Sequence, residues 1–151
     1  MQRDQLTNFL RESNAIEGIF RDPYDVEIEA FATFLSLPAL MVADLNNLQF
    51  VFAPNMPLRD RVGLNVRVGS HIAPAGGPEI AVRLTNLLAE MPDSDPWKTH
   101  VAFETLHPYC DGNGRTGRAL WAWHMRQTGR DPFALSFLHR FYYQTLEHVG
   151  R

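Results

Sequence analysis

Apolar side chains recur every three or four residues along most of this chain, and prolines and glycines separate the stretches that show this spacing. The spacing places the apolar side chains on one face of an α-helix, and proline and glycine are the residues at which helices commonly end. A helix with one apolar face has to bury that face against a neighbour. The sequence therefore predicts an all-α helical bundle, with helices over residues 4–17, 26–37, 79–91, 96–107, 113–128 and 132–149.

A segment of different character interrupts the helical pattern between Leu58 and Pro74. It contains several β-branched residues between glycines. Leu64, Val66 and Val68 alternate with polar residues, as in a short strand with one apolar face. We expect a small β-hairpin in this part of the chain.

Length, charge and cysteine content exclude several classes of protein. The chain has 151 residues, which suits a single domain over residues 1–151. Its net charge of −3 gives no reason to expect a nucleic acid or an anionic membrane as a partner, and no apolar run approaches the ~20 residues that cross a bilayer. Cys110 is the single cysteine and cannot form an internal disulfide, and no secretory signal is visible. We therefore expect a cytoplasmic protein that binds neither nucleic acid nor membranes.

The twelve residues from His107 to Arg118 bring together several reactive side chains. Two glycines flank Asn113 where a helix is predicted to begin, and free backbone N–H groups and the helix dipole favour an anion at such a place. Arg115 and Arg118 are three residues apart, share one face of that helix and suit a polyphosphate. Asp111 suits Mg²⁺, and His107 can accept a proton near neutral pH. Taken singly, Gly-Asn-Gly can be only a turn, two arginines can form a solvated face, and a lone histidine is usually not catalytic. Their combination indicates nucleotidyl or phosphoryl transfer.

The same segment, HPYCDGNGRTGR, resembles the signature of the Fic family, His-x-Phe-x-Asp/Glu-Gly-Asn-Gly-Arg-x-x-Arg. Tyr109 stands where Phe is usual, and we expect the same packing role with an added hydroxyl. Residues 66–74 resemble the flap hairpin of the family, and the helices around the signature are also similar. The resemblance extends from about Ser13 to the C-terminus. It implies the Fic fold, a helical bundle with a small β-hairpin flap.

An activity follows from this resemblance. Fic proteins mostly transfer AMP from ATP to a hydroxyl side chain of a target protein, with Mg²⁺ as the cofactor. By resemblance, His107 is the base that deprotonates the Ser, Thr or Tyr hydroxyl, and Asp111 holds Mg²⁺ on the α- and β-phosphates. The chain is therefore expected to be an enzyme, a protein adenylyltransferase, whose partners are ATP and a target protein.

The other site residues are implied by the same resemblance. Arg115 is expected on the β-phosphate and Arg118 on the γ-phosphate, and Tyr142 lies where the family often contacts the nucleoside. The anion hole, whose asparagine orients the α-phosphate, corresponds to Gly112, Asn113 and Gly114. The flap edge, which aligns the backbone of the target as strand addition does elsewhere, corresponds to Val66, Arg67, Val68 and Gly69.

A second motif lies near the start of the chain. The segment SNAIEG, residues 13–18, resembles the inhibitory signature of the family, Ser/Thr-x-x-x-Glu-Gly/Asn. Ser13 and Glu17 are four residues apart and share one face of the predicted helix, whose end can bring a carboxylate to Arg118. The resemblance implies an inhibitory helix of about residues 4–18 and autoinhibition by Glu17. The alternative is an ordinary solvated glutamate before a helix end.

Other functions stay open beside autoinhibited transfer. The Doc branch of the family is a kinase, but it carries Ala and Lys where this chain keeps the Gly-Asn-Gly glycines and Arg115. In some relatives with the inhibitory motif, the residue that matches Glu17 also positions a water that removes AMP. A further alternative is a non-catalytic module that keeps the fold and binds a nucleotide or a partner. Family members often pair through helical faces, which leaves a homo-oligomer open.

Overall fold

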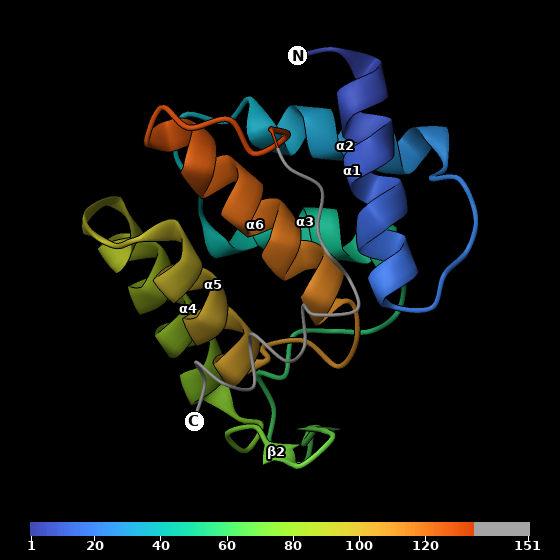
Figure 1. The fold of residues 1–151 in the computed structure, drawn as a ribbon. Helices are drawn as coiled ribbons and strands as arrows, with labels where there is room; N and C mark the ends of the chain where they lie inside the picture. Colours follow the sequence, from blue (N-terminus) through green and yellow to red (C-terminus); the bar gives the residue numbers. More distant parts are fainter. Residues whose placement is uncertain (135–151) are drawn as a thin grey trace.

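The computed structural model describes residues 1–134, which form a helical bundle with a two-stranded antiparallel hairpin (Figure 1). The helices are α1 (Arg3–Ile16), α2 (Asp25–Leu35), α3 (Val42–Phe52), α4 (Pro78–Glu90), the 3-10 turn η1 (Met91–Asp93), α5 (Pro96–Leu106) and α6 (Asn113–Gln127). The strands are β1 (Arg67–Val68) and β2 (His71–Ile72). The prediction of a mainly helical fold with a small hairpin is confirmed.

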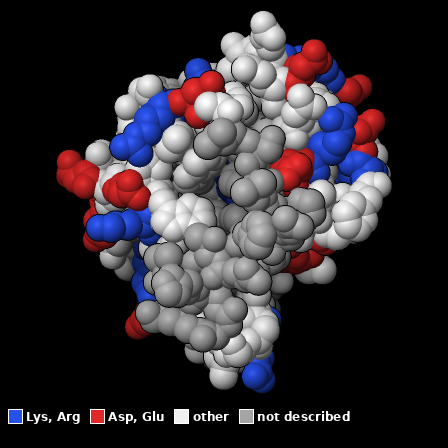
Figure 2. Space-filling model, in the orientation of Figure 1, with Lys and Arg blue, Asp and Glu red and all other residues white. Residues whose placement is uncertain are grey.

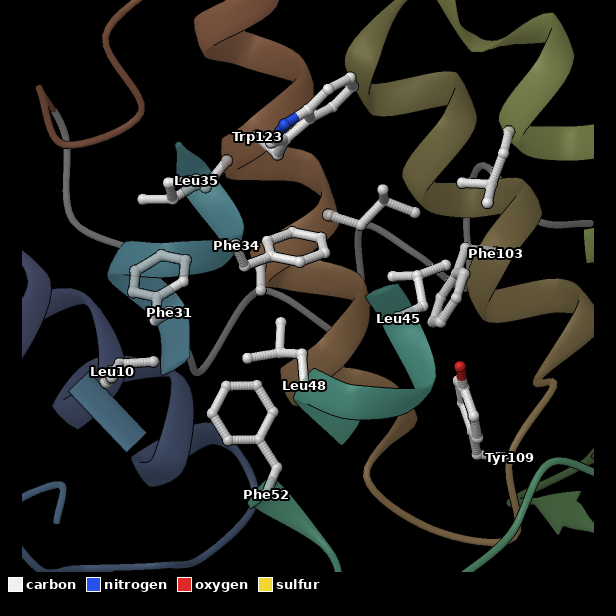
Figure 3. Close-up of a cluster of buried hydrophobic side chains, with 14 of the residues drawn as sticks. Leu10, Phe31, Phe34, Leu35, Leu45, Leu48, Phe52, Phe103, Tyr109 and Trp123 are labelled. Carbon is white, nitrogen blue, oxygen red and sulfur yellow. The ribbon is translucent and has the colours of Figure 1, made fainter. Parts of the chain in front are cut away.

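Helix α6 runs through the middle of the bundle and contacts α1, α2, α3 and α5 (Figure 1). Its Ala119, Leu120 and Ala122 are fully buried. Large apolar side chains of the surrounding helices, among them Phe31 and Phe103, pack around it (Figure 3). Burial of these faces is the main contribution that stabilises the bundle. It fixes the position of α6, whose N-terminal end carries the second half of the twelve-residue motif.

Helix α3 is absent from the sequence prediction. Its buried residues follow helical spacing at Leu45, Leu48, Gln49 and Phe52, but one of the four is polar. Phe50, on the opposite side of the helix, is 59% exposed. A polar residue inside and an apolar residue outside obscure the apolar periodicity on which the prediction of a helix depends.

The hairpin is shorter than the strand that residues 64–68 predict. Each strand has two residues, with Arg67 opposite Ile72, and both strands are exposed. The backbone before β1 is engaged elsewhere, because the carbonyl oxygen of Leu64 accepts a hydrogen bond from the buried side chain of Arg59. Val66 is half-buried but lies outside the strand. The predicted hairpin exists, but its strands bury no apolar face.

The predicted helix 96–107 ends one residue earlier than expected, and the predicted helix 132–149 lies mostly outside the described residues. Helix α5 ends at Leu106, and His107 follows it in a left-handed backbone conformation. The last predicted helix, 132–149, falls mostly on residues 135–151, so that helix and Tyr142 lie outside the described residues. Residues 132–134 form a turn.

Charged side chains of both signs are mixed on the surface. On the face shown in Figure 2, Lys and Arg side chains lie next to Asp and Glu side chains. An ion pair from Arg3 to Asp25 connects α1 with the first residue of α2, and one from Arg11 to Asp22 connects α1 with the segment before α2. Within residues 1–134, no helix combines the length and the apolar character that crossing a membrane requires.

Candidate active site

Segments that are distant in the sequence lie at one end of the bundle (Figure 1). They are the C-terminal ends of α1 and α5, the N-terminal end of α6 and the β1–β2 hairpin. The loop between α5 and α6, residues 107–112, contains the first half of the twelve-residue motif. The motif thus lies where these segments meet, and side chains of α1 and of the hairpin can reach it.

Hydrogen bonds within the motif fix the shape of the α5–α6 loop. The Asn113 amide donates to the carbonyl oxygen of Tyr109 at 2.7 Å and accepts from the Tyr109 N–H at 2.9 Å. Gly112 has a φ of 79°, and a Cβ at this position would lie 2.9 Å from the Cβ of Ala53, so both the backbone and the space require glycine. The Asn113 amide keeps one further N–H, and the N–H groups of the first turn of α6 have no partner within the helix.

Helix α3 supports this loop from the side. Nε2 of the buried Gln49 donates to the carbonyl oxygen of Asp111 at 3.0 Å. The Tyr109 ring is fully buried, and its hydroxyl donates to Oδ1 of Asn46 at 2.7 Å. Tyr109 therefore has the packing role expected of the aromatic position, and its additional hydroxyl has a hydrogen-bond partner on α3.

His107 has a φ of 50° and a ψ of 62°, which is uncommon for a residue with a Cβ. Burial lowers the pKa of His107, and a hydrogen bond with the backbone of Glu104 acts in the opposite direction. The positive charges of Arg59 and His71 lower this pKa further, while the charge of Glu17 raises it. A half-buried imidazole with a lowered pKa is neutral at pH 7 and is able to accept a proton.

Two buried arginines project from the first turns of α6. Nη1 of Arg115 donates to the carbonyl oxygen of Phe52 at 2.7 Å, and its buried Nε has no hydrogen-bond partner among residues 1–134. Burial lowers the pKa of Arg115, which the nearby carboxylate of Asp111 opposes. Arg118 is fully buried. The unsatisfied Nε–H of the buried Arg115 guanidinium suits an anionic ligand.

The C-terminal end of α1 reaches Arg118. Nη2 of Arg118 donates to Oε1 of Glu17 at 2.7 Å and to the carbonyl oxygen of Ser13 at 2.9 Å, and its Nε donates to Oγ of Ser13 at 2.7 Å. Oε1 of Glu17 also occupies the space that a Cβ of Gly114 would fill. The structure thus brings Ser13 and Glu17 together with Arg118, and it places an anionic side chain against the first turn of α6.

Two further titratable groups lie between α5 and α6, the buried His100 and the buried carboxyl oxygen of the half-buried Glu104. Oε1 of Glu104 has no hydrogen-bond partner within residues 1–134 and occupies the space that a Cβ of Gly117 would fill. Burial raises the pKa of Glu104 to about 8, and the Arg118 guanidinium opposes this shift. Burial lowers the pKa of His100 to about 3, and its Nδ1 donates to the carbonyl oxygen of Gly117 at 3.0 Å. Both side chains are therefore neutral at pH 7.

Asp111 is the exposed carboxylate of the loop, and its Oδ1 accepts a hydrogen bond from the Gly112 N–H at 2.7 Å. Within the described part of the chain, no group of three or more His, Cys, Asp or Glu side chains could hold a metal ion. Mg²⁺ usually keeps several waters and binds through one or two carboxylates together with substrate phosphates. A single exposed carboxylate beside an anion site fits a Mg²⁺ ion of this kind and does not fit a metal site made by protein ligands alone.

The residues predicted for the flap edge lie in and beside the hairpin. Arg67 and Val68 form β1, Val66 precedes it, and Gly69 lies in the turn with a φ of 57°. Nε2 of His71, on β2, lies 2.9 Å from a carbonyl oxygen in the last turn of α5. The hairpin is therefore held next to His107, and its exposed strand edges leave backbone groups with which an extended peptide can pair.

Comparison with known protein families identifies this arrangement. The model of the Fic/DOC family matches residues 3–125. The chain belongs to the Fic/DOC family. The match includes α1, the hairpin and the complete α5–α6 loop. No curated protein matches the sequence.

Three polar side chains of this Fic site were not predicted from the sequence: the buried Gln49 and Arg59 and the half-buried Glu104. Gln49 and Arg59 hydrogen-bond to backbone carbonyl oxygens, and since every residue has a carbonyl, no pattern of residue types marks such contacts. Glu104 has a signal that could have found it. It lies four residues after His100 and three before His107, which places all three on one face of the predicted helix 96–107.

Proposed function

We propose that this Fic protein is a protein adenylyltransferase that transfers AMP from ATP to a Ser, Thr or Tyr hydroxyl of a target protein, and that Glu17 inhibits it. Membership of a family that commonly consists of nucleotidyltransferases supports the class of reaction. The observation that carries the proposal is the α5–α6 loop. It joins a half-buried, neutral His107 directly to the N-terminal end of α6, from whose first turns two buried arginines project.

His107 acts on the acceptor hydroxyl in this mechanism. Its neutral ring takes the proton while the hydroxyl oxygen forms a bond to the α-phosphorus of ATP. The bond between the α-phosphorus and the oxygen that bridges to the β-phosphate breaks, and pyrophosphate leaves. A positioned general base contributes a factor of roughly 10²–10⁴ to the rate of such a step.

The first turn of α6 and the two arginines bind the triphosphate. The N–H groups of this turn and the remaining N–H of Asn113 face the negative charge that develops on the α-phosphate. Arg115 contacts the β-phosphate through its unsatisfied Nε–H, and Arg118 contacts the γ-phosphate. Asp111 would hold Mg²⁺, which neutralises charge on the phosphates when it is bound. The edge of β1 at Arg67 and Val68 aligns the backbone of the target.

Glu17 inhibits transfer because it competes for Arg118. Its carboxylate pairs with the guanidinium that the γ-phosphate needs and lies against Gly114 in the first turn of α6. ATP then binds with its phosphates displaced, and the α-phosphate is not in line with the acceptor hydroxyl. Loss of in-line geometry costs about 10² in rate.

Transfer of label from α-³²P-ATP to protein tests both parts of the proposal. Wild type, Glu17→Gly, His107→Ala and the double variant are incubated at equal concentration with Mg²⁺ and a cell lysate, followed by gel autoradiography. Glu17→Gly is expected to label itself or a target strongly, whereas the two variants without His107 are expected to be slower by at least ~10². Equal labelling by wild type and Glu17→Gly contradicts autoinhibition, and undiminished labelling by His107→Ala contradicts the role of the base.

A matched pair of variants separates the ion pair from a general effect of charge. Glu17→Gln removes the carboxylate with little change of shape and should raise labelling. Glu29→Gln removes an exposed charge on α2 and should leave labelling at the level of wild type. If both variants raise labelling equally, the contact between Glu17 and Arg118 is not the cause.

The position of Glu17 also supports a second activity, the removal of AMP. A carboxylate against the first turn of α6 is placed to activate a water toward the phosphorus of a modified side chain. Labelled, auto-modified Glu17→Gly protein is therefore incubated with unlabelled wild type or Glu17→Gln. Release of labelled AMP by wild type alone supports this activity. Nucleotide binding without transfer or release in any variant would instead indicate a non-catalytic module.

A further inference from the structure

Arg59 lies between α3 and the hairpin and is fully buried. Its guanidinium donates four hydrogen bonds, all to backbone carbonyl oxygens. Nε donates to His107 at 2.7 Å and Nη2 to Leu106 at 2.9 Å. Nη1 donates to Pro74 at 2.7 Å and to Leu64 at 3.0 Å. The ion pairs found within residues 1–134 do not include Arg59.

The four carbonyl oxygens belong to two different parts of the site. Leu106 and His107 are at the end of α5, where carbonyl groups lack partners within the helix and carry the negative end of its dipole. Leu64 and Pro74 flank the hairpin on its two sides. A single planar guanidinium therefore fixes the end of α5 relative to both stems of the hairpin.

The main chain of Arg59 makes the same connection. Its N–H donates to the carbonyl oxygen of Pro108 at 2.8 Å, and its carbonyl oxygen accepts from the Gly77 N–H at 2.9 Å. His107 itself is left-handed, with a φ of 50°. Such a conformation persists only where surrounding contacts enforce it, and the bonds of Arg59 on both sides of the His107–Pro108 peptide supply such contacts.

We propose that Arg59 is a positioning residue of the active site, which holds His107 in its left-handed conformation and keeps the hairpin at a fixed distance from it. The inference rests on the proposed function for the role of His107 as the base. A target backbone aligned on the hairpin then presents its hydroxyl at a set place relative to the imidazole. Arg59 touches neither the nucleotide site on α6 nor the reacting atoms, so its effect passes through His107 and the hairpin.

The charge of Arg59 gives a readout that needs no enzymatic activity. The groups that act on the His107 ring are Arg59, His71 on the hairpin, Glu17 at the end of α1 and the backbone of Glu104. Removal of the positive charge of Arg59 should raise the pKa of His107. The charge acts on the ring only while the guanidinium stays against the His107 backbone, so this pKa reports that contact in solution.

The first experiment is an NMR titration of the histidine ring protons without nucleotide or Mg²⁺, with the His107 signal assigned by its loss in His107→Asn. Arg59→Met should raise the pKa of His107 relative to wild type, because the positive charge that lowers it is gone. Arg61→Met is the matched control, because it removes a charge from the same loop at a side chain that is 74% exposed, and it should leave the pKa unchanged. An equal pKa in wild type and Arg59→Met, or an equal shift in both variants, overturns the proposal. Arg59→Gln, which keeps two N–H donors, replaces Arg59→Met if the latter does not fold.

The second experiment separates positioning from binding in the Glu17→Gly background. Arg59→Lys keeps the charge but loses the planar arrangement of donors, so kcat should fall by at least ~10-fold. Because the first turn of α6 is untouched, the Kd for ATP measured by calorimetry should stay within about twofold. Unchanged kcat, or a parallel loss of kcat and ATP affinity, overturns the proposal. If Glu17→Gly transfers nothing, the proposed function fails, and the titration alone decides the role of Arg59.

Discussion

Replacement of Glu104 by glutamine should stabilise the protein at alkaline pH and have little effect at acid pH. The Glu104 carboxyl is buried between α5 and α6, and burial raises its pKa from 4.5 to about 8. At a pH between these two pKa values, the folded protein keeps a proton that the unfolded chain has released. The free energy of unfolding therefore falls as the pH rises through this range. The contribution of Glu104 to stability is complete only below about pH 4.5.

The size of the effect follows from the two pKa values. A pKa difference of one corresponds to about 1.4 kcal/mol. With 4.5 in the unfolded chain and about 8 in the folded protein, the wild type loses about 4 kcal/mol of stability between about pH 5 and pH 8.5 through this group. Glu104→Gln lacks the ionisation and keeps that stability. At about 2–4 °C per kcal/mol for a chain of this size, its advantage in Tm grows by about 8–16 °C across the range.

Thermal unfolding, followed by circular dichroism at about pH 5 and at about pH 8.5, measures the effect. Other titrating groups are shared by the two proteins, so their contributions cancel in the difference between the Tm values. Glu29→Gln, at an exposed site on α2, is the matched control and should differ from wild type by the same small amount at both pH values. The reasoning is refuted if the Tm difference between wild type and Glu104→Gln is equal at both pH values.

Further predictions concern the loop and the arginines. Asp111→Ala should remove most of the Mg²⁺ dependence of ATP binding. It should not change the Tm, because the side chain is exposed. Calorimetry with and without Mg²⁺ measures the binding, and an unchanged Mg²⁺ dependence is evidence against Asp111 as a ligand. In the Glu17→Gly background, Arg118→Ala should weaken ATP binding more than ADP binding by roughly 1.5–3 kcal/mol, and equal losses would exclude the contact with the γ-phosphate. Tyr109→Phe leaves Oδ1 of Asn46 without the hydroxyl that donates to it at 2.7 Å, so urea unfolding should show a loss of about 1–2 kcal/mol; full stability would mean that water replaces the hydroxyl.

The local sequence was sufficient for most of the helices. The apolar spacing and the breaks at proline and glycine give α1, α2, α4, α5 and α6 close to their observed bounds, because the spacing of an apolar face and the residues that end a helix are both local features of the sequence. The parts of the motif from His107 to Arg118 also lie close together in the folded protein, as the sequence predicts. A loop of only six residues, 107–112, separates α5 from α6, so chain connectivity alone keeps the histidine near the first turn of α6.

The long-range contacts of the site required the tertiary structure. Arg59 meets His107 across 48 residues and Glu17 meets Arg118 across 101 residues, and apolar spacing carries no information on such distances. Motif resemblance suggested the contact of Glu17, whereas nothing in the sequence suggested that of Arg59.

The buried polar side chains show where the information in the sequence ends and where tertiary packing becomes decisive. Gln49 occupies an inward position of α3 and Arg59 an inward position of a loop, where apolar spacing predicts neither. Their partners are backbone carbonyl oxygens, which every residue has and which only folding brings within reach. The apolar pattern thus determines which segments become helices, because burial depends on side-chain type. The packing of the helices decides which carbonyl oxygens a buried guanidinium or amide can reach, and so where His107 and the anion site lie relative to each other.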